Sequence, residues 1–181
     1  MRVNKESTLD LNTVRLIVTD LDGIWTDGGI FIDDNGRELV RFSVYDGAGV
    51  VLARKAGLRL AVISARHRPA VQHRCRDLGV DELRQASADK REDFLEVCRK
   101  LDVTPAETLY LGDDLNDLRP MALAGGAVTV PNAAPEVLAA AHWVTGRRGG
   151  EGALREAIEW LLRATNRWEA VIAAFQPDTV R

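Results

Sequence analysis

Two aspartates at the end of an apolar run are the residues of this sequence best suited to chemistry. Asp20 and Asp22 follow the β-branched run 16–19, which predicts a buried parallel strand, and Gly23 allows the chain to turn directly beyond them. Residues two apart on a strand point to the same face, so both carboxylates reach the edge where open α/β sheets bind ligands. Such a pair can hold a divalent cation and leave one oxygen for nucleophilic attack. A solvated acidic loop is the alternative interpretation, because Asp is common after strands.

Polar side chains also stand at the ends of two further strand-like runs, 58–63 and 108–111, and at the start of a helix-like segment. They are Ser64, Asp113, Asp114, Asp117 and Lys90. Because parallel strands end at one edge of a sheet, groups far apart in the sequence converge there. Clustered carboxylates need a cation and suit Mg²⁺, whereas a hydroxyl and an ammonium suit the oxygens of a phosphoryl group. The pattern therefore predicts Mg²⁺-dependent phosphate ester hydrolysis at this edge.

Strand-like and helix-like segments alternate along the chain, which predicts an α/β fold with a doubly wound parallel sheet. Helices are expected over 49–55, 69–78, 90–101 and 135–141, in a segment ending near 124 and in another that includes Leu154, with further strands over 127–130 and 143–144. Asn35-Gly36 between the apolar runs 30–32 and 39–44 predicts a β-hairpin directly above the acids. This insertion, about 29–44, is too small to seal an active site alone.

The length of 181 residues fits one domain. We expect a disordered or extended N-terminus over 1–12, one α/β domain over 13–165 and an amphipathic C-terminal tail over 166–181. Apolar residues of the tail recur at helical spacing, at Trp168, Val171, Ile172 and Phe175. As a helix, the tail either packs on its own subunit as a final core element or docks across a subunit boundary and gates a neighbouring active site.

Composition excludes several classes of protein. With 46% apolar residues, 28% charged residues and a formal net charge of −3, the chain has no electrostatic basis for binding nucleic acid. No run approaches 18 apolar residues and the first ten residues lack the apolar core of a signal peptide, so we expect no membrane span and a cytoplasmic location. Cys75 and Cys98 lack metal-ligand spacing and are expected to be unpaired core thiols.

Four motifs together resemble those of the haloacid dehalogenase superfamily of phosphohydrolases. They are DLDG at 20–23, the strand-end Ser64, Lys90 and GDDLND at 112–117. More narrowly, the span from about 14 to 164, including DGAG at 46–49 and GGEGALRE at 149–156, resembles the 3-deoxy-D-manno-octulosonate 8-phosphate phosphatases. The resemblance implies a Rossmann-like fold without a cap domain. It also implies a homotetramer in which the hairpins form a central barrel and neighbouring subunits close the active sites.

The resemblance assigns a role to each motif. Asp20 attacks phosphorus, and Asp22 protonates the leaving alkoxide and later activates water against the aspartyl-phosphate. Asp20, Asp113 and the backbone carbonyl of Asp22 hold Mg²⁺, while Ser64 and Lys90 hold the phosphoryl oxygens.

Supporting and substrate-binding positions follow from the same resemblance. Asp114 and Asp117 are expected to orient the metal-binding residues. The positions expected at the substrate are Lys90, Arg66, Asp46 and Gly47.

Departures from the family pattern leave the substrate open. Ser64 replaces a Thr and keeps the hydroxyl, whereas Tyr45 replaces an Arg near the expected carboxylate pocket. IWTDGG and the long tail look more like the related nonulosonate (sialic-acid-type) 9-phosphate phosphatases, but those tend to carry Glu where this chain has Arg66. We therefore expect a phosphomonoesterase of a small sugar-acid phosphate, with the octulosonate 8-phosphate favoured over a nonulosonate 9-phosphate.

Two functions from other classes are weighed against this one. A regulatory or assembly domain of the same fold would retain the catalytic residues by descent, and no catalytic residue is missing here to support it. A phospho-accepting signalling receiver fits less well, because receivers are shorter and have neither an Asp-x-Asp strand end nor an extra hairpin.

Overall fold

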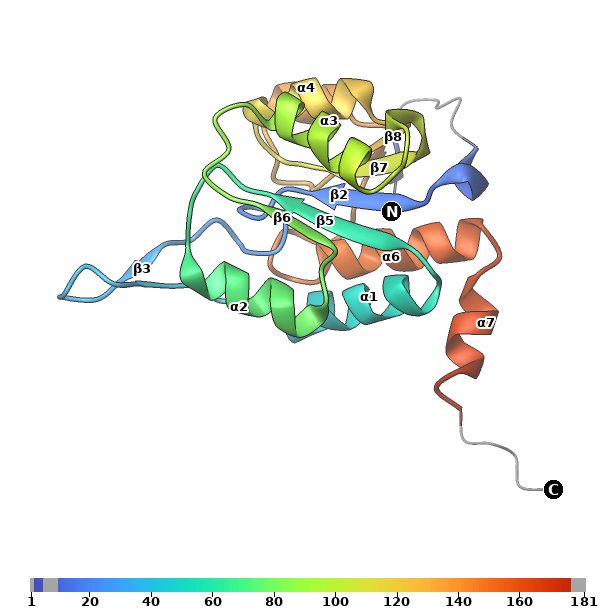
Figure 1. The fold of residues 1–181 in the computed structure, drawn as a ribbon, viewed down its shortest axis with the longest axis horizontal. Coiled ribbons are helices and arrows are strands. Elements are labelled where there is room, and N and C mark those ends of the chain that lie inside the picture. Colours follow the sequence, from blue (N-terminus) through green and yellow to red (C-terminus); the bar gives the residue numbers. More distant parts are fainter. Residues whose placement is uncertain (1, 5–9, 177–181) are drawn as a thin grey trace.

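A seven-stranded sheet runs through the centre of the protein in the computed structural model, which describes residues 2–4 and 10–176 (Figure 1). In spatial order its strands are β1 (Arg2–Val3), β9 (Trp143–Val144), β8 (Gly126–Thr129), β7 (Thr108–Leu111), β2 (Leu16–Thr19), β5 (Arg59–Ile63) and β6 (Glu82–Arg84). The β1–β9 pair is antiparallel, and each other neighbouring pair is parallel. The chain winds outward in both directions from β2, which confirms the doubly wound sheet and places its switch point beside β2.

Helices cover both faces of this sheet. They are α1 (Val44–Lys55), α2 (Pro69–Leu78), α3 (Lys90–Lys100), α4 (Leu118–Leu123), α5 (Pro135–Ala140), α6 (Ala153–Ala164) and α7 (Trp168–Ala173), with short 3-10 turns η1 (Leu11–Thr13), η2 (Pro105–Glu107) and η3 (Leu115–Asp117). One core cluster contains side chains of α3, α4 and α5, and the other contains side chains of α1, α2, α6 and α7. Figure 1 shows α3 and α4 on one side of the sheet and α1, α2 and α6 on the other. None of the helices in the described part of the chain is long and apolar enough to cross a membrane.

Strand β2 is buried on both faces because its side chains alternate between the two core clusters. Leu16 and Val18 pack with the cluster under α3, whereas Ile17 packs with the cluster under α1 and α6. A strand covered on both sides carries apolar residues on both faces, which is why Leu16, Ile17 and Val18 form a continuous apolar run. Because β2 ends at Thr19, the next residue, Asp20, lies at the edge of the sheet.

The hairpin is present but shorter than predicted. It consists of β3 (Phe31–Ile32) and β4 (Glu38–Leu39), and it projects from the body of the protein (Figure 1). The second predicted strand, 39–44, is wrong beyond Leu39, since Val44 already belongs to α1.

Helix α1 begins five residues earlier than the predicted Gly49. Ser43 caps it by accepting a hydrogen bond from the backbone N–H of Tyr45 at 3.2 Å. Gly47 and Gly49 lower helix propensity, which hid the first turn from sequence reasoning. A Cβ at Gly49 would lie 2.8 Å from the Cα of Arg155 in α6, so this glycine allows the two helices to pack closely.

Two short edge strands were not predicted. β6 carries charged residues at both ends and is recognised through its parallel pairing with β5. β1 lies within the predicted N-terminal segment 1–12, where Asn4 also donates to the carbonyl of Ala141 at 3.1 Å. The remainder of that segment before Asp10, residues 1 and 5–9, lies outside the described residues.

The first part of the C-terminal tail packs on its own subunit. Val171 of α7 is buried in the core cluster under α6, and Trp168 packs against the same cluster. Arg167 donates to the backbone carbonyl of Asn12 at 3.0 Å. This arrangement favours the core-helix interpretation of the tail as far as Gln176, and residues 177–181 lie outside the described part.

Candidate active site

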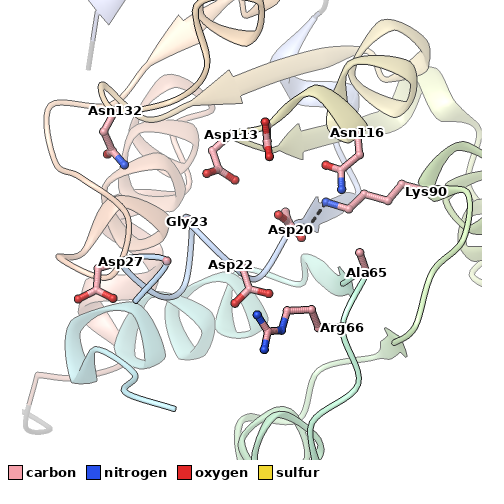
Figure 2. A pocket seen from close by; sticks show the side chains of 12 residues that line it. Asp20, Asp22, Gly23, Asp27, Ala65, Arg66, Lys90, Asp113, Asn116 and Asn132 are labelled. Atoms are coloured by element: carbon pink, nitrogen blue, oxygen red, sulfur yellow. Dashed lines mark ion pairs between the residues drawn. The ribbon is translucent and has the colours of Figure 1, made fainter. Parts of the chain in front are cut away.

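Asp20 and Asp22 line a pocket of about 320 Å³ at the switch point of the sheet. The N–H of Asp20 bonds to the carbonyl of Leu111 at 2.8 Å, which continues the β2–β7 ladder up to the site. Predicted site residues that line the pocket are Asp20, Asp22, Arg66, Lys90, Asp113 and Asp114. Asp27, Asn116 and Asn132 also line it and were not predicted. Figure 2 shows Lys90 reaching Asp20 from one side, while Asp22 and Arg66 lie close together on another.

Lys90 joins two buried carboxylates. Its Nζ lies 2.9 Å from Oδ1 of Asp20 and 2.8 Å from Oδ1 of Asp117. Asp89 caps α3 by accepting the N–H of Arg91 at 2.9 Å, which places Lys90 at the first helical position. Burial opposes the ammonium charge, but Asp117 and Asp20 outweigh it and raise the pKa of Lys90. Lys90 is therefore a permanently charged partner of Asp20.

Asp117 organises the loop that follows β7. Its Oδ1 accepts the hydroxyl of Tyr110 at 2.9 Å, and its Oδ2 accepts the backbone N–H of Asp113 at 3.1 Å and of Asp114 at 3.3 Å. A Cβ at Gly112 would overlap this side chain. The predicted orienting role of Asp117 agrees with these contacts. Tyr110 was not predicted, although a tyrosine inside a buried strand needs a partner for its hydroxyl.

Asp114 orients the start of η3. Its carboxylate accepts the backbone N–H of Leu115 at 2.8 Å, and its side chain borders the pocket. The backbone of the loop after β7 is thus held by two carboxylates, the more exposed Asp114 and the buried Asp117.

Three carboxylates stand close enough to share a cation. Oxygens of Asp20, Asp113 and Asp117 lie within 4.8 Å of one another, and Oδ1 of Asp113 is buried with no hydrogen-bond partner among the described residues. Gly23, at φ +82°, approaches Asp113 so closely that a Cβ would overlap its carboxylate. An all-oxygen donor set of this kind fits a hard divalent cation. The carboxylate of Asp22 is not in this group, and the part of its backbone carbonyl in holding the metal stays a prediction.

The electrostatics of the cluster are unfavourable without a cation. Burial and the neighbouring charge of Asp117 raise the pKa of Asp20 to about 8, despite the opposing effect of Lys90. Burial and Asp117 likewise raise the pKa of Asp113 to about 7. Both carboxyl groups therefore tend to hold a proton near neutral pH until a cation replaces it.

We expect the affinity for Mg²⁺ to rise with pH. A cation binds the ionised carboxylates, so below their raised pKa values it must displace the protons of Asp20 and Asp113. Each displaced proton weakens the apparent affinity about tenfold per pH unit below that group's pKa. As the pH is raised from about 6, the dissociation constant for Mg²⁺ should therefore fall, and it should level off above about pH 8. Calorimetry in two buffers of different ionisation enthalpy measures both the affinity and the proton release. An affinity independent of pH, with no protons released, would contradict this electrostatic account.

Ser64 lies at the end of β5, directly beside β2. It is fully buried, and its Oγ accepts the backbone N–H of Arg66 at 3.2 Å. Its neighbours Ala65 and Arg66 line the pocket. This hydrogen bond helps to fix the loop that borders the site. A direct hydrogen bond from Ser64 to the phosphoryl group stays a prediction.

Arg66 points between the pocket and the hairpin. Its Nη2 lies 2.5 Å from Oε1 of Glu38 on β4, and both side chains are partly exposed. The hairpin thus contacts a pocket residue of its own chain. A guanidinium at this rim is suited to binding a carboxylate of a ligand.

Arg68 was missed by sequence reasoning. Its guanidinium contacts both carboxylate oxygens of Asp22, and its side chain is only 7% exposed. Nothing local in the sequence distinguishes it from Arg66, since both follow the same strand end. The contact depends on the parallel pairing of β5 with β2, which brings the segment after β5 beside the segment after β2.

Asp46 and Gly47 do not line this pocket. The carboxylate of Asp46 accepts the backbone N–H groups of Gly152 at 3.2 Å and Arg155 at 3.0 Å, and only 1% of the residue is exposed. A Cβ at Gly47 would collide with Arg74. In the described chain this part of α1 caps the start of α6, outside the pocket, and a contact of these two residues with substrate stays a prediction.

Asp46→Ala should lower the stability of the protein. Two N–H groups at the N-terminus of α6 would lose their acceptor, at a cost of about 1–3 kcal/mol in the free energy of unfolding. Asp77→Ala on the exposed face of α2 is the matched control, and we expect it to change stability by less than about 0.5 kcal/mol. Denaturant unfolding and steady-state kinetics check both. A large rise in KM with unchanged stability would support the substrate-binding interpretation.

Comparison with known proteins agrees with this geometry. A family model for haloacid dehalogenase-like hydrolases matches residues 27–125. The 3-deoxy-D-manno-octulosonate 8-phosphate phosphatase of Escherichia coli (strain K12) is 38% identical over 151 residues, covering 83% of this chain and 80% of that protein. This chain belongs to the haloacid dehalogenase-like hydrolases. As a member of that family related to these enzymes, it is a phosphoric monoester hydrolase.

Solved structures of such hydrolases share the fold across nearly the whole chain. The 3-deoxy-D-manno-octulosonate 8-phosphate phosphatase of Moraxella catarrhalis, solved in complex with a magnesium ion, a phosphate ion and a KDO molecule, aligns with a TM-score of 0.88 at 35% identity, covering 92% of this chain and 95% of that one. The cobalt-bound enzyme of Haemophilus influenzae aligns with a TM-score of 0.85 at 32% identity, covering 88% of this chain and 94% of that one. The predicted α/β fold of the haloacid dehalogenase type is thereby confirmed.

Proposed function

We propose that this hydrolase removes the phosphate of 3-deoxy-D-manno-octulosonate 8-phosphate through an aspartyl-phosphate on Asp20, with Mg²⁺ as its cofactor. The observation that carries the proposal is the convergence of Asp20, Lys90 and Asp113 in one pocket, in a chain similar to enzymes named for that reaction. The presence of each predicted catalytic residue supports an active enzyme over a regulatory domain of the same fold.

In the first half-reaction, Asp20 is the nucleophile and Asp22 is the general acid. An oxygen of Asp20 forms a bond to phosphorus while the bond from phosphorus to the sugar oxygen breaks, and Asp22 gives its proton to that leaving oxygen. In the second half-reaction the carboxylate of Asp22 takes a proton from water, which attacks the phosphorus and releases phosphate and free Asp20. Each group thus returns to its starting form.

Cations favour the approach of an anionic ester to these acids. Lys90, 2.9 Å from Asp20, offsets the repulsion between that carboxylate and the phosphoryl oxygens. Bound by Asp20, Asp113 and the backbone carbonyl of Asp22, Mg²⁺ would supply further positive charge to those oxygens. Tyr110 and Asp117 hold Lys90 and the loop after β7 in place.

Arg66 supports a sugar acid as the substrate. Its guanidinium lines the pocket and is suited to a bidentate contact with a carboxylate. The nonulosonate 9-phosphate alternative is supported by IWTDGG and the long tail, but Arg66 favours the octulosonate because the nonulosonate enzymes tend to carry Glu there.

A panel of phosphate esters tests the proposal. Each ester is assayed with Mg²⁺ and after chelation: octulosonate 8-phosphate, a nonulosonate 9-phosphate, and a hexose phosphate without a carboxylate. We expect the highest kcat/KM for the octulosonate ester and no turnover after chelation. Preference for the nonulosonate ester would select the alternative, and turnover of none of them would favour a regulatory domain.

We also propose that the protein works as a homotetramer in the cytoplasm. Ile32, Leu39, Val44 and Tyr45 on and beside the hairpin are each more than 60% exposed, and soluble monomers rarely leave such apolar surface uncovered. The two buried, unpaired thiols of Cys75 and Cys98 agree with a reducing compartment. Light scattering at micromolar concentration measures the mass, and an active monomer would contradict the assembly.

A further inference from the structure

Asp22 is held by the buried guanidinium of Arg68, which lies just after β5 and does not itself line the pocket. The Asp22 side chain is 32% exposed, whereas the Arg68 side chain that contacts both of its oxygens is 7% exposed. A single nitrogen, Nη2, contacts both oxygens, so the carboxylate group is held at its two ends at once. A carboxylate that lines the pocket is thus held by a more deeply buried side chain.

Arg68 also needs Asp22, because its buried guanidinium requires a negatively charged partner. A buried charge without a partner is strongly unfavourable, and Asp22 provides the ion pair that the described structure gives this guanidinium. The Nε of Arg68 is also buried, with no hydrogen-bond partner among the described residues.

The backbone around Arg68 is braced by two neighbouring segments. Arg68 is the N-cap of α2, directly before Pro69, and its N–H donates to Oε1 of Gln85 at 2.7 Å. The next residue, Ala86, is held at φ +55°, in the left-handed region, and its N–H bonds to the carbonyl of Arg66 at 3.3 Å. A non-glycine residue kept in that region indicates that the surrounding contacts determine this loop strongly.

We infer that Arg68 is a positioning residue that aims the carboxyl group of Asp22 at the oxygen of the leaving group. The inference rests on the acid role of Asp22 in the proposed function. Proton transfer requires hydrogen-bond reach, and small displacements of a catalytic group lower the rate strongly. In the first half-reaction, Arg68 therefore matters for esters whose leaving oxygen needs a proton, and little for esters whose leaving group departs as a stable anion.

Arg68→Gln separates these two cases. The test uses a sugar phosphate, whose alkoxide must be protonated, and p-nitrophenyl phosphate, whose phenolate need not be. We expect the single-turnover rate of leaving-group release to fall roughly 10- to 100-fold for the sugar ester and less than about threefold for the aryl ester; kcat is not the readout, because hydrolysis of the aspartyl-phosphate is common to both esters. Arg74→Gln, at a partly buried arginine of the same helix that does not line the pocket, is the matched control and should leave both rates unchanged.

A double-mutant cycle makes the test specific for Asp22. In an Asp22→Asn background there is no acid to aim, so Arg68→Gln should cost less than about twofold on either ester. If Arg68→Gln does not fold, Arg68→Lys carries the test, because its ammonium keeps the charge but not the planar shape; a selective loss of about three- to tenfold on the sugar ester is expected.

Equal losses on both esters in the variant tested, no loss on either, or an undiminished loss in the Asp22→Asn background would overturn the inference. Equal slowing of leaving-group release from both esters by Asp22→Asn alone would contradict the acid role itself, and the inference with it. The failure of the positioning role is thereby distinguished from a failure of the proposed function.

Discussion

Asp20→Asn should reduce kcat by roughly four orders of magnitude or more while leaving the fold intact. An amide is nearly isosteric with the carboxylate but a far poorer nucleophile. Lys90 keeps its 2.8 Å contact with Asp117, so the substitution does not leave a buried ammonium without a partner. Replacing a carboxyl group whose pKa is raised by burial also removes part of the repulsion within the acidic cluster.

The matched control for this variant is Asp27→Asn. Asp27 also lines the pocket, but its carboxylate accepts the N–H of Gly29 at 2.9 Å and lies 3.5 Å from Arg41, away from the acidic cluster. We expect that variant to stay within about tenfold of the wild-type rate. Single-turnover kinetics and thermal unfolding check both proteins. Wild-type turnover by Asp20→Asn would rule out the aspartyl-phosphate mechanism.

Asp22→Asn should lower kcat for a sugar phosphate about 10²- to 10⁴-fold, the range expected for loss of a general acid. The amide cannot give a proton to the alkoxide in the first half-reaction or take one from water in the second. Hydrolysis of p-nitrophenyl phosphate should lose much less in the first step, because its leaving group is stable without a proton.

Pre-steady-state kinetics with the aryl ester separate the two roles of Asp22. In Asp22→Asn we expect a burst of p-nitrophenolate followed by slow turnover, because the aspartyl-phosphate forms but its hydrolysis lacks a base. Arg68 loses its charged partner in this variant, so the measurements belong well below the melting temperature. Slow release of p-nitrophenolate with no burst would show that Asp22 serves another purpose.

Much of the site could be predicted because its signals are local. Asp20 and Asp22 follow a run that is buried on both faces, and Asp113 follows another, so strand geometry alone carries them to one edge of a parallel sheet. Helix α2 agrees with its predicted bounds because Pro69 begins it and Gly79, at φ +67°, ends it. Lys90 was identified from its order among the motifs.

Contacts between distant segments decided the rest. Val44 begins α1 although glycines follow it, because close packing against α6 outweighs their low helix propensity. Asp46 caps α6 and does not line the described pocket, since residues more than a hundred positions away supply its partners. Arg68 reaches Asp22 across 46 positions. The sequence by itself determined which residues stand at the strand ends, because strand burial and turn chemistry act within a few residues. Only the tertiary structure decided what each side chain pairs with, because buried charges and polar groups must find partners wherever the fold brings them.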